Sequence, residues 1–187
     1  MGRTHSRLTP DLVEFIERQH LFFVATAPLS ETGHVNLSPK GLDTFRVIDD
    51  RTVAYLDLTG SGIETAAHLQ ENGRIAVLFC SFDGAPRLVR LHGRGRVVER
   101  AHADYDALSA RYPAQPGVRG VIVIDVQRIS GSCGFGVPLY EYQGDRRQLT
   151  DWASRKGPDG IADYAARHNE SVDGLPGLET PEDAGRE

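Results

Sequence analysis

A glycine-flanked turn, Gly60-Ser61-Gly62, is the first place where this sequence could bind a ligand through its backbone. An apolar run reaches the turn from Tyr55, and a helical pattern over residues 63–72 follows it. The first N–H groups of a helix lack intrahelical partners and carry a partial positive charge, and glycine lets a ligand approach closely. The arrangement therefore predicts a phosphate site at the start of this helix.

A capping box explains the same residues without a ligand. Ser61 would cap the helix, and Glu64 would reach back toward the Ser61 backbone. Glu64 also brings negative charge toward the anion site, which disfavours a phosphate. Taken alone, these residues favour the cap.

A second polar group ends a strand pattern over residues 34–38. Asn36, Ser38 and Lys40 surround Pro39 at a point where the strand could have stayed apolar. They either solvate the strand end or face a polar ligand, and from these residues alone the first interpretation is the simpler one.

Arginines recur between residues 87 and 100, mostly at even spacing, so a strand would place several of them on one face. A solvated outer face is the leading interpretation, and a local anion site is the alternative. The residues are Arg87, Arg90, Arg94, Arg96 and Arg100.

Familiar catalytic motifs are absent from the sequence. The seven histidines have no zinc-ligand spacing, and there is no G-x-S-x-G, Walker or dinucleotide glycine pattern. Cys80 lies in an apolar run and Cys133 in a glycine-rich loop, which predicts neither a metal site nor a disulfide. Any chemistry is then expected to come from a bound cofactor that the protein positions.

The composition predicts one globular domain. The chain has 187 residues, of which 40% are hydrophobic and 25% charged, and no apolar run could cross a bilayer. The net charge of −5 argues against nucleic acid as the main partner. No export signal is evident, so a cytoplasmic location is the default expectation.

Short strand patterns joined by tight turns dominate the first 130 residues. Residues 93 and 95, both glycine, mark a bulge or bend in the longest of them. The pattern predicts a mainly β fold with peripheral helices, built as a six- or seven-stranded antiparallel barrel. Strands are expected over residues 21–26, 34–38, 45–48, 52–58, 74–82, 87–98 and 121–129, and helices over residues 10–19, 63–72 and 103–112.

The remaining 57 positions, residues 131–187, read as an extension packed on the same domain. A glycine-rich loop over residues 131–138 leads to a short strand-like run at 139–142 and to helical patterns at 149–155 and 159–167. Trp152, the single tryptophan, is interpreted as a packing anchor, with a lid over a ligand as the alternative. An acidic tail rich in glycine and proline follows from residue 171.

The order of these features resembles the pyridoxamine 5′-phosphate oxidase-like family of flavin-binding split barrels. The resemblance covers about residues 9–129 and rests on three stretches, Asn36-Leu37-Ser38-Pro39-Lys40, Gly60-Ser61-Gly62 and Glu71-Asn72-Gly73-Arg74. The extension is similar to that of an actinobacterial and fungal branch. The resemblance implies a split barrel over residues 1–130 that binds FMN between the two subunits of a homodimer.

The resemblance also implies which residues meet the cofactor. The strand that carries Asn36, Leu37, Ser38 and Pro39 would run along the isoalloxazine ring, and Lys40 would meet the phosphate. The phosphate and ribityl chain would lie against the strand end and helix start over residues 55–65, a stretch in which Ser61 serves either as cap or as ligand. The residues of that stretch are Tyr55, Leu56, Asp57, Gly60, Ser61, Gly62 and Thr65.

Departures from the family pattern narrow the expected function. Glu64 and Thr65 stand where the oxidases carry a basic pair, and the tryptophan-proline-arginine pattern of their substrate pocket is missing. We therefore expect an FMN-dependent oxidoreductase for a small molecule other than pyridoxamine phosphate. The alternatives are an F420-dependent reductase and a non-enzymatic flavin or haem carrier or sensor, for which His34, His68 and His92 are candidate haem ligands.

Overall fold

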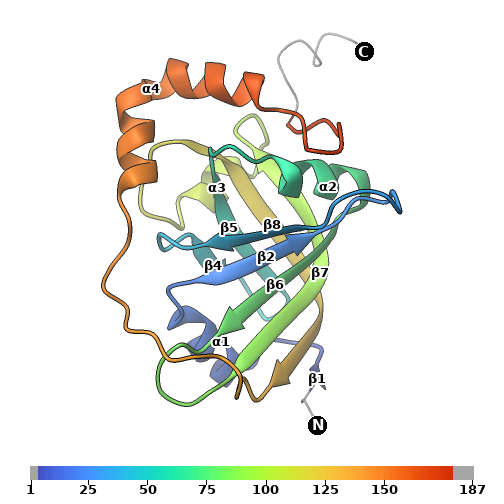
Figure 1. Cartoon of the computed structure of the whole chain (residues 1–187), viewed down its shortest axis with the longest axis vertical. Coiled ribbons are helices and arrows are strands. Elements are labelled where there is room, and N and C mark those ends of the chain that lie inside the picture. Colours follow the sequence, from blue (N-terminus) through green and yellow to red (C-terminus); the bar gives the residue numbers. More distant parts are fainter. Residues whose placement is uncertain (1–3, 179–187) are drawn as a thin grey trace.

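Eight antiparallel strands form one sheet in the computed structural model, which describes residues 4–178 (Figure 1). The hydrogen-bonded order is β3-β2-β6-β7-β8-β5-β4, and β1 pairs with β8. The two ends of this path, β3 and β4, are not paired with each other, so the barrel is split. The strands are β1 (Thr4–His5), β2 (Phe22–Thr26), β3 (Asn36–Lys40), β4 (Phe45–Val47), β5 (Thr52–Leu58), β6 (Arg74–Cys80), β7 (Leu88–Glu99) and β8 (Val118–Ser132).

In the described part of the chain, four helices lie around the sheet: α1 (Pro10–Glu17), α2 (Glu64–Asn72), α3 (Tyr105–Ser109) and α4 (Gln148–Arg167). Figure 1 shows α2 and α4 at one end of the barrel and α1 at the other. Pro10 occupies the first turn of α1, where its missing N–H costs no hydrogen bond, and Leu12 and Ile16 of α1 are buried in the core. The predicted mainly β fold with peripheral helices is confirmed. The two-residue β1 was not predicted.

Strand β5 is buried on both faces, which decides where its side chains point. Tyr55 belongs to the core inside the barrel, together with Phe22 and Val24 of β2. Leu56 points the opposite way and packs in a second apolar cluster outside the sheet, beside α3. Asp57 is only 2% exposed and returns to the inner face.

The arginine-bearing strand β7 carries Arg90, Arg94 and Arg96 on its solvent side, as the leading interpretation expected. The predicted irregularity is a bulge between His92 and Gly93. A Cβ atom on Gly93 would lie 2.1 Å from the Asp125 carbonyl oxygen, so the two backbones touch at this point.

Two local predictions are wrong. The run at residues 139–142 is not a strand, because its aromatic side chains anchor it instead: Tyr140 packs on Phe82 and Tyr142 stacks on His20 with ring centroids 3.7 Å apart. The capping box is also absent, because α2 begins later than Ser61 and its N-cap is Ile63.

The two helical patterns near the C-terminus are joined in one element, α4, across a kink at Gly157, where φ is 69° and Pro158 follows. The segment 133–147 connects β8 to α4 along the outside of the barrel (Figure 1). Of the expected acidic tail, residues 171–178 form a turn closed by the bridge between Glu170 and Pro176, and the rest lies outside the described residues. Within residues 4–178, no helix combines the length and apolarity needed to cross a membrane.

Candidate functional site

Polar side chains gather inside the barrel where β2, β3 and α2 meet. Because Thr26 pairs with Asn36 and Val24 with Ser38, the even-numbered residues of β3 face inward. We call the set Thr26, Asn36, Ser38, Tyr55, Thr65 and His68 the inner polar cluster.

Asn36 holds the inner polar cluster together. Its amide nitrogen donates to the hydroxyls of Thr26 at 3.1 Å and Thr65 at 3.0 Å. Its amide oxygen accepts from the Ser38 hydroxyl at 2.9 Å. Both donors and the acceptor of one side chain are therefore used to fix three neighbours from three different elements.

His68 lies at the closed side of the cluster and is completely buried. Its Nδ1 is 2.9 Å from the Thr26 hydroxyl, and its Nε2 has no hydrogen-bond partner among the described residues. Burial lowers the pKa of His68 below its ordinary value, so the imidazole is neutral at pH 7. In residues 4–178 no set of three His, Cys, Asp or Glu side chains is arranged to hold a metal ion.

Tyr55 presents a buried phenol to the same space. Its hydroxyl makes no well-aligned hydrogen bond to the described residues, although the Thr65 hydroxyl lies near it. Burial raises the pKa of Tyr55 well above its ordinary value, and the Asp57 charge adds to the rise while Thr65 and Arg119 oppose it. The group is therefore a neutral phenol at physiological pH.

A charged group adjoins the cluster. Asp57 Oδ2 accepts from Arg119 Nε at 3.0 Å and pairs with its Nη2 at 3.0 Å, while Oδ1 lies 3.8 Å from Lys40 Nζ. Arg119 also donates to the Gly62 carbonyl oxygen at 2.9 Å. Arg119 is thus fixed by two partners, whereas Lys40 is only loosely paired, and Asp57 Oδ1 accepts no hydrogen bond.

The N-terminus of α2 faces this region without a side-chain cap. Its first intrahelical bond runs from the Ala67 N–H to the Ile63 carbonyl, which leaves the N–H groups of residues 64–66 without intrahelical acceptors. Glu64 extends back toward Gly62, since its carboxylate would lie 2.6 Å from a Cβ there. The helix start therefore offers donors beside one acidic side chain.

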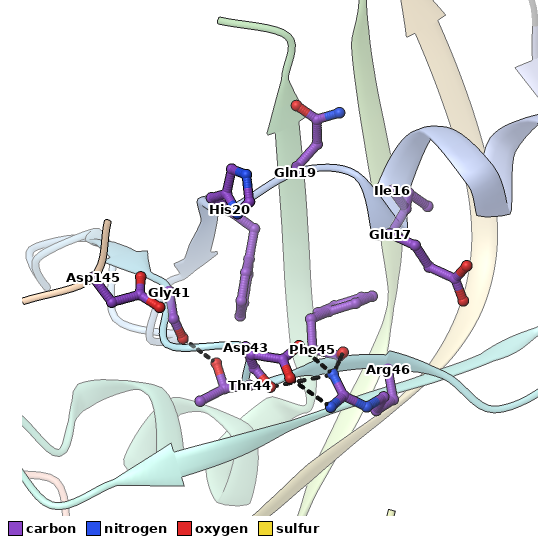
Figure 2. Close-up of a pocket in the computed structure, with 11 residues that line it drawn as sticks. Ile16, Glu17, Gln19, His20, Gly41, Asp43, Thr44, Phe45, Arg46 and Asp145 are labelled. Atoms are coloured by element: carbon purple, nitrogen blue, oxygen red, sulfur yellow. Dashed lines mark hydrogen bonds and ion pairs between the residues drawn. The ribbon is translucent and has the colours of Figure 1, made fainter. Parts of the chain in front are cut away.

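A cavity of about 440 Å³ adjoins the end of β3 (Figure 2). Phe22 and Phe45 form its apolar floor, and His20 and Asp145 approach from other segments. Figure 2 shows Arg46 bound to Asp43, which holds the pKa of that carboxyl below its ordinary value. The loop at residues 41–44, which lines the cavity, has a constrained backbone, because Leu42 and Asp43 both adopt positive φ.

The structure brings six of the sequence-predicted residues together: Asn36, Ser38, Lys40, Tyr55, Asp57 and Thr65. The loop of Gly60, Ser61 and Gly62 lies beside them and is tied in through Gly62. Four others point elsewhere. Leu37 and Pro39 are exposed on the outer face of β3, Leu56 is in the cluster outside the sheet, and Trp152 packs on Tyr164 of α4.

Two residues of this site, Thr26 and Arg119, were missed from the sequence, and His68 was named only as a candidate haem ligand. Thr26 continues the inward register of Phe22 and Val24, so strand alternation was an available signal. His68 follows Thr65 at helical spacing on one face of α2. The other two histidines considered lie outside the cluster: His34 binds Asp173, and His92 is exposed on β7.

Comparisons with known proteins agree with this architecture. The family model described as pyridoxamine 5′-phosphate oxidase matches residues 8–133. The pyridoxamine 5′-phosphate oxidase family protein ustO of Aspergillus flavus is 39% identical over 194 residues, covering 93% of this chain and 77% of ustO.

Solved structures share the fold. HupZ of Group A Streptococcus is 25% identical with a TM-score of 0.51, and the match covers 65% of this chain and 91% of HupZ. A candidate pyridoxamine 5′-phosphate oxidase of Lactobacillus delbrueckii is 18% identical with a TM-score of 0.53, covering 67% and 94% of the two chains. The predicted split barrel is confirmed.

Proposed function

The chain belongs to the pyridoxamine 5′-phosphate oxidase family, and on that premise we propose that it is an FMN-dependent oxidoreductase acting on a small molecule. We further propose that it works as a homodimer with the flavin at the subunit interface. The observation that carries the proposal is the uncapped N-terminus of α2, which adjoins the inner polar cluster and two cationic side chains.

The residues present fit a polar, phosphorylated cofactor. Tyr55, Asp57 and His68 each keep one buried polar atom without a hydrogen-bond partner in the described structure. Unpaired buried polar groups are costly and rare, so a ligand that pairs with them would stabilise the fold. Gly60 adds an open approach, because a Cβ there would have no atom within 4 Å.

The charges of the site also suit a phosphate monoester. Lys40 and Arg119 supply two positive charges, Asp57 a negative charge that Arg119 pairs with, and Glu64 a second negative charge at the helix start. Arg119 neutralises Asp57 at short range, which leaves the loosely paired Lys40 to turn toward a phosphate. Lys40 and the N–H groups of α2 would then replace the basic pair that Glu64 and Thr65 do not provide.

Bound FMN would supply hydride transfer, and the protein would position both partners. Asn36 and Ser38 would orient the polar edge of the ring, and the neutral phenol of Tyr55 would donate a hydrogen bond without adding charge. The cavity lined by Phe22 and Phe45 offers the substrate an apolar floor with polar walls. This lining gives no cluster of basic side chains for a substrate phosphate, which supports a substrate other than pyridoxamine phosphate.

The homodimer part of the proposal is supported by the exposed edge strand β3. Leu37 is 66% exposed and Val35 is 73% exposed beside it, on a strand whose second edge has no partner in the sheet path. Apolar side chains on an unpaired edge are a liability unless another chain covers them.

The test begins with the absorption spectrum of the purified protein and identification of the released chromophore by mass. FMN titration of Lys40→Ala should show dissociation at least about tenfold weaker than wild type, because a charge-assisted contact to the phosphate is lost. Arg90→Ala removes an outer-face cation and is the matched control. A colourless protein that takes up no FMN, or equal FMN affinity in Lys40→Ala, would contradict the proposal.

A further inference from the structure

A second cavity, of about 480 Å³, lies between the start of β8 and the inner side of α4. We call it the α4 cavity. The kink at Gly157 lets both halves of α4 contribute to one wall, and the apolar part of that wall consists of Ala153, Ile161, Ala162 and Ala165. Thr59, Arg100, Gln115 and Arg119 line the opposite side.

Two buried polar atoms on that side lack partners among the described residues. Thr59 is 1% exposed, and its hydroxyl makes no hydrogen bond although its backbone N–H donates to the Gly117 carbonyl. The amide nitrogen of Gln115 donates to the Leu42 carbonyl at 2.8 Å, but its buried amide oxygen accepts nothing. A fixed acceptor and a hydroxyl therefore face a space large enough for a small molecule.

Arg100 gives the cavity a positive rim. Its Nε and Nη2 both donate to the Val118 carbonyl, at 3.3 and 3.0 Å, and its guanidinium lies 6.0 Å from the Tyr105 ring centroid. These contacts hold the planar cation in place, and a held guanidinium is well suited to a carboxylate. Arg119 is already engaged by Asp57 and the Gly62 carbonyl, so Arg100 is the better anion partner of the two.

We propose that the α4 cavity binds a small aliphatic hydroxy acid. Its carboxylate pairs with Arg100, its hydroxyl donates to the Gln115 amide oxygen and its apolar tail packs on the alanines of α4. The Thr59 hydroxyl, which lines the same cavity, then gains a hydrogen-bond partner on the bound hydroxy acid. This site requires no flavin, so its test is independent of the proposed oxidoreductase activity.

The probe is 2-hydroxy-4-methylpentanoate, which combines the three features. Two analogues each lack one of them: 4-methylpentanoate has no hydroxyl, and 4-methylpentane-1,2-diol has no carboxylate. Binding to the full chain as purified is measured by titration calorimetry and by ligand-observed NMR, with Trp152 fluorescence as a local reporter because this residue precedes Ala153 in α4. Saturable binding is expected for the hydroxy acid, and binding about tenfold weaker for each analogue.

Thr59→Val gives the sharpest test, because it should act in opposite directions on stability and binding. Replacing an unpartnered buried hydroxyl by a methyl group should raise the Tm of the free protein, yet weaken probe binding about threefold or more. Thr44→Val is the matched control: Thr44 is equally buried, but its hydroxyl donates to the Gly41 carbonyl, so its loss should lower Tm and leave probe binding unchanged.

Ala165→Phe should abolish probe binding by filling the cavity, and Arg100→Gln should weaken it about tenfold. An unchanged circular dichroism spectrum and a cooperative thermal transition of the Ala165→Phe protein report that the remainder of the molecule is intact. The proposal is overturned if the hydroxy acid shows no saturable binding at millimolar concentration. It is also overturned if Ala165→Phe and Arg100→Gln bind the probe as wild type does.

Discussion

At the scale of single residues, the two ionisable side chains of the inner polar cluster, Tyr55 and His68, are both uncharged at neutral pH. Asn36 uses both of its N–H donors and one acceptor site of its amide oxygen within the protein, and these bonds fix Thr26, Ser38 and Thr65. Tyr55 and His68 are held neutral by burial. The charge of the site therefore resides in Lys40, Asp57, Arg119 and, at the start of α2, Glu64. Within the inner polar cluster, a fall of pH below neutrality protonates His68 first.

His68 should make stability depend on pH in a defined direction. Since burial lowers its pKa below 6.5, the unfolded chain binds a proton at this position more readily than the folded protein. The free energy of unfolding should therefore fall as pH decreases through 6.5 toward the lower pKa of the folded state. In His68→Asn, whose amide can still meet Thr26, this part of the decrease should disappear.

Urea unfolding between pH 7.5 and 5 measures the effect. His92→Asn controls for the loss of an exposed imidazole from the outer face of β7. Parallel pH profiles for wild type and His68→Asn would show that protonation of His68 is not linked to folding.

The sequence alone located part of this site because one signal was local. Polar residues at alternate positions around Pro39 were visible in the pattern, and they do face inward with Asp57 and Thr65. Arg119 could not be found in the same way, because its pairing with Asp57 depends on the register of β5 against β8. Leu37 and Leu56 were included as neighbours in the family pattern, and strand alternation directs their side chains away from the cluster.

At the scale of secondary structure elements, the long antiparallel pair of β7 and β8 sets the shape of the barrel. Its ladder runs from Leu88 to Glu99 and is interrupted once, at the bulge between His92 and Gly93. The bulge bends the strand that carries the extra residue, and it brings the Gly93 backbone into direct contact with the Asp125 carbonyl. The sequence indicated this irregularity from two glycines, because glycine in a strand usually marks a bend or a close backbone approach.

Gly93→Ala should therefore destabilise the protein strongly. The added methyl group would lie 2.1 Å from a backbone oxygen that cannot move without breaking the ladder, and overpacking of this kind costs about 1–3 kcal/mol or more. Gly136→Ala is the control, because a Cβ at that glycine would have no neighbour within 4 Å. Chemical denaturation of both variants gives the comparison, and equal midpoints would contradict the close contact at the bulge.

Elements that follow the barrel were harder to place from the sequence. The helical patterns around Trp152 were found because their spacing is local, whereas the run at residues 139–142 was taken for a strand from its apolar content. The conformation of this run is set by contacts with Phe82 and His20, which are distant in the sequence. Their rings pack on Tyr140 and Tyr142, and no strand edge in the described part of the chain pairs with the run. Tertiary contacts outweigh β propensity there.

At the scale of the whole molecule, the split in the barrel leaves β3 with its polar residues inward and its apolar residues outward. Asn36 and Ser38 face the proposed flavin site, while Leu37 lies between them on the exposed face. One short strand therefore connects the cofactor site with the surface proposed to meet a second copy. Dimer formation and flavin affinity should depend on each other, because ordering of β3 by either event favours the other.

Leu37→Glu tests this coupling without altering any side chain of the inner polar cluster. A carboxylate on the apolar edge should resist burial against a second subunit, shifting the protein toward monomer and weakening FMN binding together. Analytical ultracentrifugation at several protein concentrations gives the oligomeric state, and FMN titration of the same samples gives the affinity. Phe135→Glu, which places the same charge at an exposed aromatic position in another segment, should change neither. A Leu37→Glu protein that stays dimeric would place the interface elsewhere, and a monomer that keeps full FMN affinity would show that one subunit completes the flavin site by itself.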